Sequence, residues 1–305
     1  MMLIKIPKTN LLHRAYGRML RIFSPYLSDE LYLKLLFRHH MGCQLNLDNP
    51  KTFNEKLQWL KLYNRNPLYT VMVDKVKAKK YVASKIGEQY IIPTLGVWEN
   101  ADDVDFNSLP SRFVIKCNHN SGKGMYICKD RSRMNVEKIR NGLRKGLREN
   151  YYLHGREWPY KDVPRRIIAE QYMESKDRKE LQDYKFFCFN GEPRLCQVIS
   201  DRSTDGKIDF YDMQWNRIIG LLEPCNDVFH NSDIDFPCPT SFNEMKRCAH
   251  ILAEGMPFSR IDFYDIDGKA FFGEITFFPT SGLGMFSPES WSEKTGNWIT
   301  LPIKQ

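Results

Sequence analysis

The strongest constraint on this fold is a predicted β-hairpin near the C-terminus, in which acidic side chains interrupt two apolar runs. Asp262 lies in the run Ser259–Tyr264, and Glu274 lies in the run Gly273–Phe278. Carboxylates are depleted in strands and costly to bury, so two of them on paired strands indicate a functional face. The connecting segment Asp265–Lys269 contains the Asp-Gly step that is typical of tight turns.

The geometry of this turn decides which side chains share a face. A two-residue turn at Asp267-Gly268 would place Asp262 and Glu274 on opposite faces, because side chains alternate along a strand. A three-residue loop with Gly268 in the left-handed region would place them together, and we favour this loop. It pairs Lys269 with Asp265, and Glu274 with Arg260. The shared face then carries four polar side chains, which are Arg260, Asp262, Glu274 and Thr276.

This shared face predicts a metal site. Carboxylate and hydroxyl oxygens suit Mg²⁺, because this ion binds a few carboxylates together with substrate phosphates. The alternative is an ordinary surface hairpin, in which an Arg260–Glu274 pair is common and only weakly stabilising.

Composition limits the class of protein and its partners. The 305 residues suffice for one large domain or two smaller ones, and the 42% hydrophobic content predicts a globular core. The net charge of +8 is dispersed along the chain and favours an anionic small ligand, an anionic glycan or loose contact with an acidic membrane. No motif indicates nucleic acid as a partner.

Cysteine and targeting patterns favour a cytoplasmic protein. None of the eight cysteines forms a C-x-x-C motif, which argues against a zinc site. No secretory signal or membrane-spanning run is apparent, so we expect reduced thiols and a cytoplasmic location. Peripheral contact at the inner face of the membrane stays open.

Helical periodicity dominates residues 1–65, and alternating patterns are common in the rest. Thr52 and Glu55 have the spacing of a capping box. A basic amphipathic helix within the first 25 residues is expected to dock on its own domain, with a membrane surface as the alternative. Later strands and helices predict an α+β fold with mostly antiparallel sheets. Strands are expected over 88–98, 112–117, 125–128, 167–173, 184–189, 194–199, 208–211 and 217–222, and helices over 74–85, 136–151 and 242–255.

A polar, glycine-bearing segment at 118–124 follows one of these strands. Its spacing is not that of a Walker A motif, but glycines free backbone N–H groups to approach an anion. A glycine-containing hairpin turn is the alternative. The donors are supplied by Ser121, Gly122, Lys123 and Gly124.

Two lysines and one glutamate lie inside apolar, strand-like runs. Lys116 and Lys185 indicate either a cleft that binds an anion or edge positions that prevent aggregation. Glu170 lies near the end of its strand, where it could hold a purine together with neighbouring backbone groups. An ordinary sheet edge would have the same pattern.

Taken in order, these elements resemble the ATP-grasp superfamily. The resemblance is closest to the TupA-like ATP-grasp proteins of bacterial surface-polysaccharide gene clusters, on the runs Phe53–Trp59 and Glu274–Gly282, and it covers roughly residues 50–290. The ordered motifs are Asp74-Lys75, Val114-Ile115-Lys116 with its glycine loop, Glu170–Met173, Asp183-Tyr184-Lys185, Arg260-Ile261-Asp262 and Glu274-x-Thr276.

The resemblance implies an ATP-grasp domain over residues 66–305 that follows a helical extension over 1–65. ATP would lie between a central subdomain at about 113–200 and a C-terminal subdomain at 201–305. The implied ATP contacts are Lys75, Lys116 and Lys185 with the phosphates, the closing loop Ser121–Gly124, then Glu170, Gln171 and Met173 with adenine, and Asp177 with the ribose. Mg²⁺ would be bound by Asp262, Glu274 and Thr276, and Arg260 and Lys185 would be the catalytic residues at the transferred phosphate. The superfamily usually has asparagine where this chain has Thr276, a weaker ligand.

The implied reaction is the ATP-dependent activation of a carboxylate as an acyl phosphate, followed by attack of an amine to form an amide. The expected partners are an amine or amino acid and an anionic glycan or glycan precursor. The resemblance does not carry over the acceptor, because the N-terminal region is helical and short. The alternatives are an ATP-dependent glycan kinase, a non-catalytic module of polysaccharide assembly, and a glycosyltransferase, whose D-x-D motif has a match only in the predicted turn.

Overall fold

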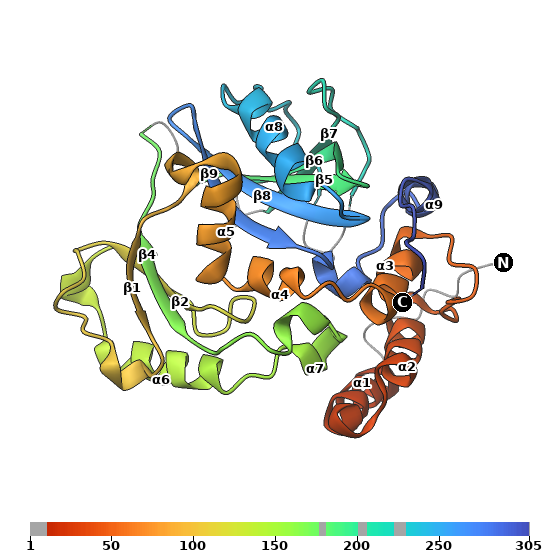
Figure 1. Cartoon of the computed structure of the whole chain (residues 1–305), viewed down its shortest axis with the longest axis horizontal. Helices are drawn as coiled ribbons and strands as arrows, with labels where there is room; N and C mark the ends of the chain where they lie inside the picture. Colours follow the sequence, from red (N-terminus) through yellow and green to blue (C-terminus); the bar gives the residue numbers. More distant parts are fainter. Residues whose placement is uncertain (1–10, 177–180, 201–205, 223–229, 305) are drawn as a thin grey trace.

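Two antiparallel sheets form the body of the protein. The computed structural model describes residues 11–176, 181–200, 206–222 and 230–304. Figure 1 shows the four-stranded sheet at the lower left and the five-stranded sheet above it. Helices α4 (Leu68–Val73) and α5 (Lys77–Ile86) lie where the two sheets meet. The predicted α+β class with antiparallel pairing is therefore confirmed.

The smaller sheet packs one face on a core of its own and turns Lys116 and Glu170 from the other face toward a pocket. Its strands β1 (Thr94–Trp98), β2 (Phe113–Cys117), β3 (Tyr126–Cys128) and β4 (Ile167–Gln171) have the order β1-β4-β2-β3. Phe113, Ile115 and Ile167 belong to a separate core with helix α6 (Val136–Leu147). Because side chains alternate, Lys116 and Glu170 project from the opposite face.

The larger sheet has the order β7-β6-β5-β8-β9. Helix α8 (Phe242–Ala253) covers one of its faces, and residue Phe242 of that helix stacks on Phe186. The expected strand at 217–222 is wrong, because Arg217 and Leu222 form only isolated bridges. The five strands are β5 (Asp183–Phe189), β6 (Glu192–Ser200), β7 (Lys207–Tyr211), β8 (Phe258–Ile266) and β9 (Lys269–Thr276).

Helices at both ends of the chain complete the core of the larger sheet. These are α2 (Asp29–Met41), α3 (Phe53–Tyr63) and α9 (Ser290–Asn297), and the short α7 (Tyr152–Gly155) lies beside them. Helix α1 (Leu11–Phe23) packs on α2 in a separate small cluster. The capping box of Thr52 and Glu55 is confirmed. Phe53 packs against Phe258 with ring centroids 4.9 Å apart, so α3 joins the main core.

Helix α1 docks on α2 as expected, but only along a narrow side. Leu20 is its only buried residue, whereas Leu11, Met19 and Phe23 are exposed. No helix in the described ranges has the length and apolar character needed to cross a membrane. The seven cysteines in those ranges are free thiols, and Cys225 lies outside them.

Candidate functional site

The hairpin of β8 and β9 closes through a two-residue turn. Ile266 lies opposite Lys269, and both Asp267 and Gly268 are in the left-handed region, with φ of 52° and 80°. The three-residue loop that we favoured is therefore wrong. Asp-Gly suits this tighter turn, because a type I′ turn needs positive φ at both central residues.

A β-bulge at Gly273 nevertheless restores the predicted shared face. Phe263 lies opposite Phe272, but Asp262 lies opposite Glu274, so Gly273 is the extra residue on its strand. A Cβ atom on Gly273 would lie 3.1 Å from the carbonyl oxygen of Asp262, so the close approach favours glycine. The bulge interrupts the alternation of side chains along β9 once. The carboxylates of Asp262 and Glu274 therefore project from the same face of the hairpin.

These side chains form a compact ionic cluster. The Asp262 carboxylate accepts two bonds of 2.7 Å from the Arg260 guanidinium and one of 2.5 Å from Lys185 Nζ on the neighbouring strand. Arg260 also donates to Glu274 Oε1 at 3.2 Å, and the Thr276 hydroxyl donates to the same oxygen at 3.2 Å. The predicted metal and transfer residues are thus brought together.

Glu274 is the carboxylate of this cluster that reaches the solvent. Its side chain is 41% exposed, against 4% for Asp262. Burial raises the pKa of Glu274, but Lys75, Arg260, Lys185 and Lys116 outweigh that effect and lower it to about 2. Glu274 therefore stays ionised at any ordinary pH and is available to a cation.

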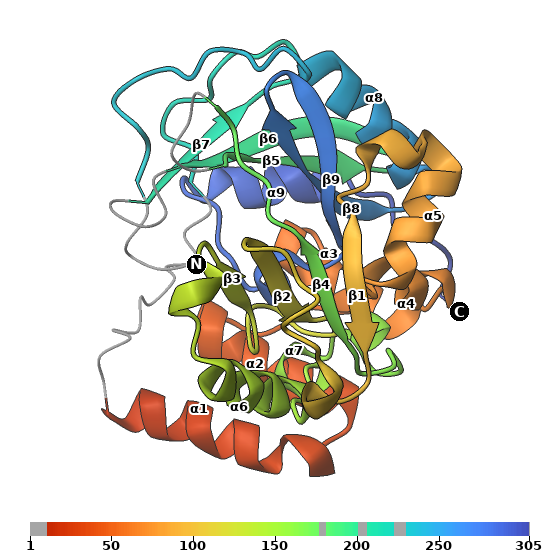
Figure 2. The ribbon, with the colours of Figure 1, turned by 90° about the vertical axis from the view of Figure 1, so that its left-hand side faces the viewer.

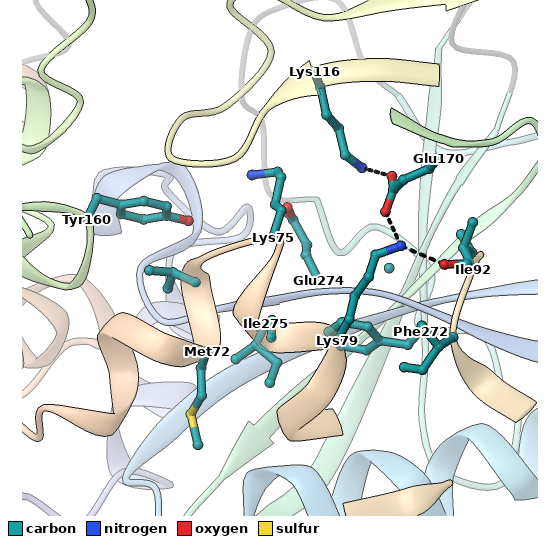
Figure 3. Close-up of a pocket in the computed structure, with 14 residues that line it drawn as sticks. Met72, Lys75, Lys79, Ile92, Lys116, Tyr160, Glu170, Phe272, Glu274 and Ile275 are labelled. Atoms are coloured by element: carbon teal, nitrogen blue, oxygen red, sulfur yellow. Dashed lines mark hydrogen bonds and ion pairs between the residues drawn. The ribbon is translucent and has the colours of Figure 1, made fainter. Parts of the chain in front are cut away.

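A pocket that is partly open to solvent lies between the two sheets. Figure 3 shows Lys116 pointing toward Glu170 on one side of it, with Lys75 and Glu274 beside each other on the other side. Each comes from a different element: the α4–α5 connection, β2, β4 and β9. Tyr160 lines the far end of the pocket (Figure 3).

Glu170 lies between two lysines at one end of the pocket. Its oxygens are 2.6 Å from Lys79 Nζ and 2.5 Å from Lys116 Nζ, as Figure 3 shows. Lys79 also donates to the Ile92 carbonyl at 2.6 Å. Burial raises the pKa of Glu170, but the two lysines outweigh it and lower the pKa below the ordinary value. The Glu170 carboxylate is therefore an anion, and it neutralises Lys116 on β2 and Lys79 on α5.

A buried polar network around the neighbouring Asp74 holds Lys75 in place. Asn118 donates to Asp74 at 2.8 Å, and Arg166 pairs with the other Asp74 oxygen at 2.7 Å. Lys75 Nζ donates to the Asn120 carbonyl at 2.9 Å. Burial lowers the pKa of Lys75, and nearby Glu274 partly offsets this. The ammonium group is held at the pocket wall with capacity for further anionic contacts.

The predicted phosphate loop lies outside the lining of the pocket. Its glycines have positive φ, 80° at Gly122 and 74° at Gly124, and its tip is exposed. Lys123 lies 3.4 Å from Glu149. Asn120, at the base of the loop, joins it to Lys75. Closure of Ser121–Gly124 over phosphates stays a prediction.

The predicted adenine contacts are placed only in part. Glu170 lines the pocket, whereas the backbone N–H of Gln171 already donates to the Pro93 carbonyl at 3.0 Å. Met173 follows the end of β4, and neither Gln171 nor Met173 lines the pocket. Asp177, predicted to bind ribose, lies outside the described residues.

Sequence reasoning missed Lys79 and a buried cluster behind the pocket. Lys79 follows Lys75 by four residues, a spacing that places both on one side of a helix and that could have identified it. Lys61 Nζ donates to the carbonyls of Gly155 and Ser281 at 2.6 and 2.7 Å, and Ser281 Oγ donates to Glu157 at 2.6 Å. No spacing signals these contacts.

The buried cluster gives a structural role to the polar residues in the run Phe53–Trp59 on α3. Asn54 and Gln58 donate to the Gly282 carbonyl at 3.0 and 2.9 Å, beside the contacts of Lys61. These bonds hold the left-handed backbone of Thr280, Ser281 and Gly282, directly after β9. Burial lowers the pKa of Lys61 to about 7, and Glu157 partly offsets this. Helix α3 therefore stabilises the segment that follows β9, the strand that carries Glu274.

The residues fit one Mg²⁺ ion shared with phosphates better than an ion held by protein alone. In the described part of the chain, no three His, Cys, Asp or Glu side chains gather to hold a metal. Asp262 and Glu274 face each other across the hairpin, which supplies the one or two carboxylates that Mg²⁺ uses beside phosphate oxygens. Asp262 is already bound by Lys185 and Arg260, so Glu274 is the more available ligand.

Comparison with protein families gives one match that spans most of the chain. The model of the TupA-like ATP-grasp family matches residues 55–300. No curated protein sequence matches.

Several solved structures are similar in part. D-alanine–D-alanine ligase of Helicobacter pylori is 14% identical, with a TM-score of 0.43 over 82% of this chain and 69% of that one. The Bacillus anthracis ligase, complexed with ATP, is 15% identical, with a TM-score of 0.38 over 68% of this chain and 54% of that one. D-cycloserine synthetase is 17% identical, with a TM-score of 0.39 over 69% and 64%. The matched part of this chain thus spans little more than half the length of the Bacillus anthracis enzyme, and the family match carries the assignment.

Proposed function

Because this chain belongs to the TupA-like ATP-grasp family, we propose that it is an ATP-dependent carboxylate–amine ligase that acts through an acyl phosphate. It attaches an amino acid or a related amine to a sugar acid or sugar amine of a bacterial surface polysaccharide. One observation carries the proposal: carboxylates from β4 and β9 lie beside Lys75, Lys79 and Lys116 around one pocket, and Arg260 joins the β9 carboxylate to the Lys185–Asp262 pair.

The charge pattern supports a nucleoside triphosphate. Lys75 and Lys116 line the pocket, and Lys185 and Arg260 continue the positive charge behind Glu274. Phosphoryl transfer needs little covalent chemistry from the protein, because positioned cations stabilise the charge that develops. Mg²⁺ held by Glu274 and Asp262 would supply further neutralisation of that charge.

Each residue then has a distinct role. Lys75 and Lys116 bind phosphate oxygens, and Arg260 and Lys185 orient and stabilise the transferred phosphate. Thr276 supports Glu274 through their 3.2 Å hydrogen bond. The loop Ser121–Gly124 closes over the phosphates. Adenine lies at the Glu170 end with Gln171 and Met173, and Asp177 contacts the ribose.

Binding of ATP requires an exchange of ionic partners. Lys116 is paired with Glu170 at 2.5 Å, so a phosphate must compete with that carboxylate. Glu170 keeps Lys79 as a partner at 2.6 Å when Lys116 turns to the phosphate. This arrangement avoids leaving a buried carboxylate unpaired, which would be costly.

The glycan part of the proposal rests on the family and on charge. The chain has a net charge of +8, which favours an anionic glycan or its nucleotide- or lipid-linked precursor. Kinase chemistry on a glycan hydroxyl would release the same nucleotide, so the product decides between the two reactions.

The direct test is isothermal titration of Mg²⁺–ATP into the wild type, Glu274→Gln and Glu99→Gln. We expect binding to the wild type and to Glu99→Gln, whose carboxylate is exposed after β1, and binding at least about tenfold weaker in Glu274→Gln. Absence of binding to the wild type would end the ligase proposal. ADP release would then be screened with amino acids and sugar acids, with mass spectrometry separating an amide from a phosphorylated sugar.

A further inference from the structure

Helix α1 has an apolar face that no described part of the chain covers. Its attached side is narrow, because only Leu20 is buried, in a small cluster with Tyr32 and Leu36 of α2. Figure 2 shows α1 as the outermost helix along the lower edge of the protein. The exposed side chains lie on one side of the helix: Leu11 is 79% exposed, Met19 45%, Ile22 69%, Phe23 53% and Tyr26, just after the helix, 83%.

The orientation of α1 is fixed by close contacts on its attached side. The rings of His13 and His39 stack with centroids 3.8 Å apart. A Cβ atom on Gly17 would lie 2.9 Å from the His39 ring, so α2 approaches the helix closely at this glycine. The exposed apolar face therefore points away from the body as a consequence of packing.

Basic residues lie beside the exposed apolar face of α1. The first 28 residues contain five lysines and arginines and no aspartate or glutamate, so the surplus charge is not evenly dispersed as the composition suggested. Arg14, Arg18 and Arg21 are exposed on the helix, and none forms an ion pair with a carboxylate in the described ranges. The apolar face is thus bordered by cations that need an anionic partner.

An anionic bilayer satisfies both features, whereas a second copy of the chain does not. A two-fold pairing of α1 would bring arginines close to arginines without acidic residues on the helix to offset them. A bilayer surface takes up large apolar side chains at the acyl boundary and attracts arginines to acidic headgroups. We propose that α1 lies in the surface of an anionic lipid bilayer and attaches the protein to it. This attachment is independent of the reaction in the pocket.

The test is co-sedimentation of the full chain with lipid vesicles. We expect binding to phosphatidylcholine vesicles that contain phosphatidylglycerol, weak binding to phosphatidylcholine alone, and release by high salt. Ile22→Asp should lower the partition coefficient by about tenfold or more, because one large apolar side chain no longer enters the acyl boundary. Ile219→Asp is the matched control: this isoleucine is 84% exposed on the segment after β7, and its substitution should leave binding unchanged.

Several outcomes would overturn the proposal. These are absence of binding to the anionic vesicles, equal binding to both kinds of vesicle, and unaltered binding of Ile22→Asp. Sedimentation velocity provides a further check, because a wild-type dimer that Ile22→Asp dissociates would assign the face to a second copy. The substitution should leave the thermal unfolding midpoint unchanged, since Ile22 is exposed, so loss of binding would not reflect unfolding.

Discussion

The two sheets carry the same kind of ion pair, one lining the pocket and one joined to it through Arg260 and Glu274, but they are held in place differently. Lys116 lies 2.5 Å from Glu170 in the smaller sheet, and Lys185 lies 2.5 Å from Asp262 in the larger one. The smaller sheet has a separate core with α6, whereas the larger sheet shares its core with helices from both ends of the chain. The larger sheet is therefore the more extensively packed support for the carboxylates of the hairpin, and the smaller sheet is a wall of the pocket with a smaller core of its own.

The largest effect is expected from inserting an alanine between Phe272 and Gly273. With the bulge kept at Gly273, the added residue would take the place opposite Asp262 and move Glu274 opposite Ile261, on the face that packs on α8. We expect Mg²⁺–ATP binding to fall below detection by titration, while circular dichroism still shows a folded protein. Gly273→Ala keeps the bulge and the register, and its cost should be about 1 kcal/mol of unfolding free energy with binding retained. Wild-type affinity in the insertion variant would refute this account of the larger sheet.

The second effect compares the two ion pairs directly. Asp262→Asn removes the main partner of Lys185 and Arg260, and Glu170→Gln removes that of Lys79 and Lys116. Chemical denaturation should show a loss of about 3 kcal/mol for Asp262→Asn and about 1 kcal/mol for Glu170→Gln, because the lysine in the larger sheet is more deeply buried. Equal losses would mean that the deeper burial of Lys185 does not raise the cost of removing its carboxylate.

The third prediction concerns pH. The folded pKa of Glu274 is about 2, below its ordinary value of 4.5, so its ionised form stabilises the folded state. That contribution is complete above pH 4.5 and is lost as the pH falls toward 2. The stability difference between the wild type and Glu274→Gln, measured by denaturation at a series of pH values, should therefore shrink across this interval. A difference that grows as the pH falls would contradict the assigned electrostatics.

The smallest effect is expected at the exposed loop of the smaller sheet. Lys123→Met should change the unfolding free energy by less than about 0.5 kcal/mol, because the Lys123–Glu149 contact is 3.4 Å long and exposed on the lysine side. If the loop closes over phosphates, the same change should weaken Mg²⁺–ATP binding about fivefold in titration. Lys138→Met, an exposed lysine on α6, is the control and should leave affinity unchanged.

Features encoded locally were predicted well, and features made by distant contacts were not. Alternating apolar residues correctly indicated strands β2, β5 and β8, and the Thr52–Glu55 spacing correctly indicated a helix start. The shared face of Asp262 and Glu274 was predicted correctly but from the wrong turn, because an isolated strand glycine such as Gly273 signals a bulge only weakly.

The remaining errors have the same physical origin. The contact of Lys61 with Gly155 joins residues 94 positions apart, which no periodic pattern reports. The run 217–222 has strand-forming residues but no neighbouring strand to pair with beyond isolated bridges. The exposed face of α1 was expected to dock because amphipathic helices usually do, and only the packing of α2 shows which side is buried.

Arg156 joins the N-terminal helices to the region behind the pocket, and this join affects how a substrate reaches the pocket. Its buried guanidinium donates to the Ser24 hydroxyl and carbonyl at 2.8 and 2.5 Å and pairs with Asp29 at 3.0 Å. The next residue, Glu157, is bonded to Ser281 in the cluster behind the pocket. If α1 rests on a bilayer, this rigid join sets the angle at which the pocket faces the lipid plane. A lipid-linked substrate diffusing in that plane would then approach from one side only, in a two-dimensional search.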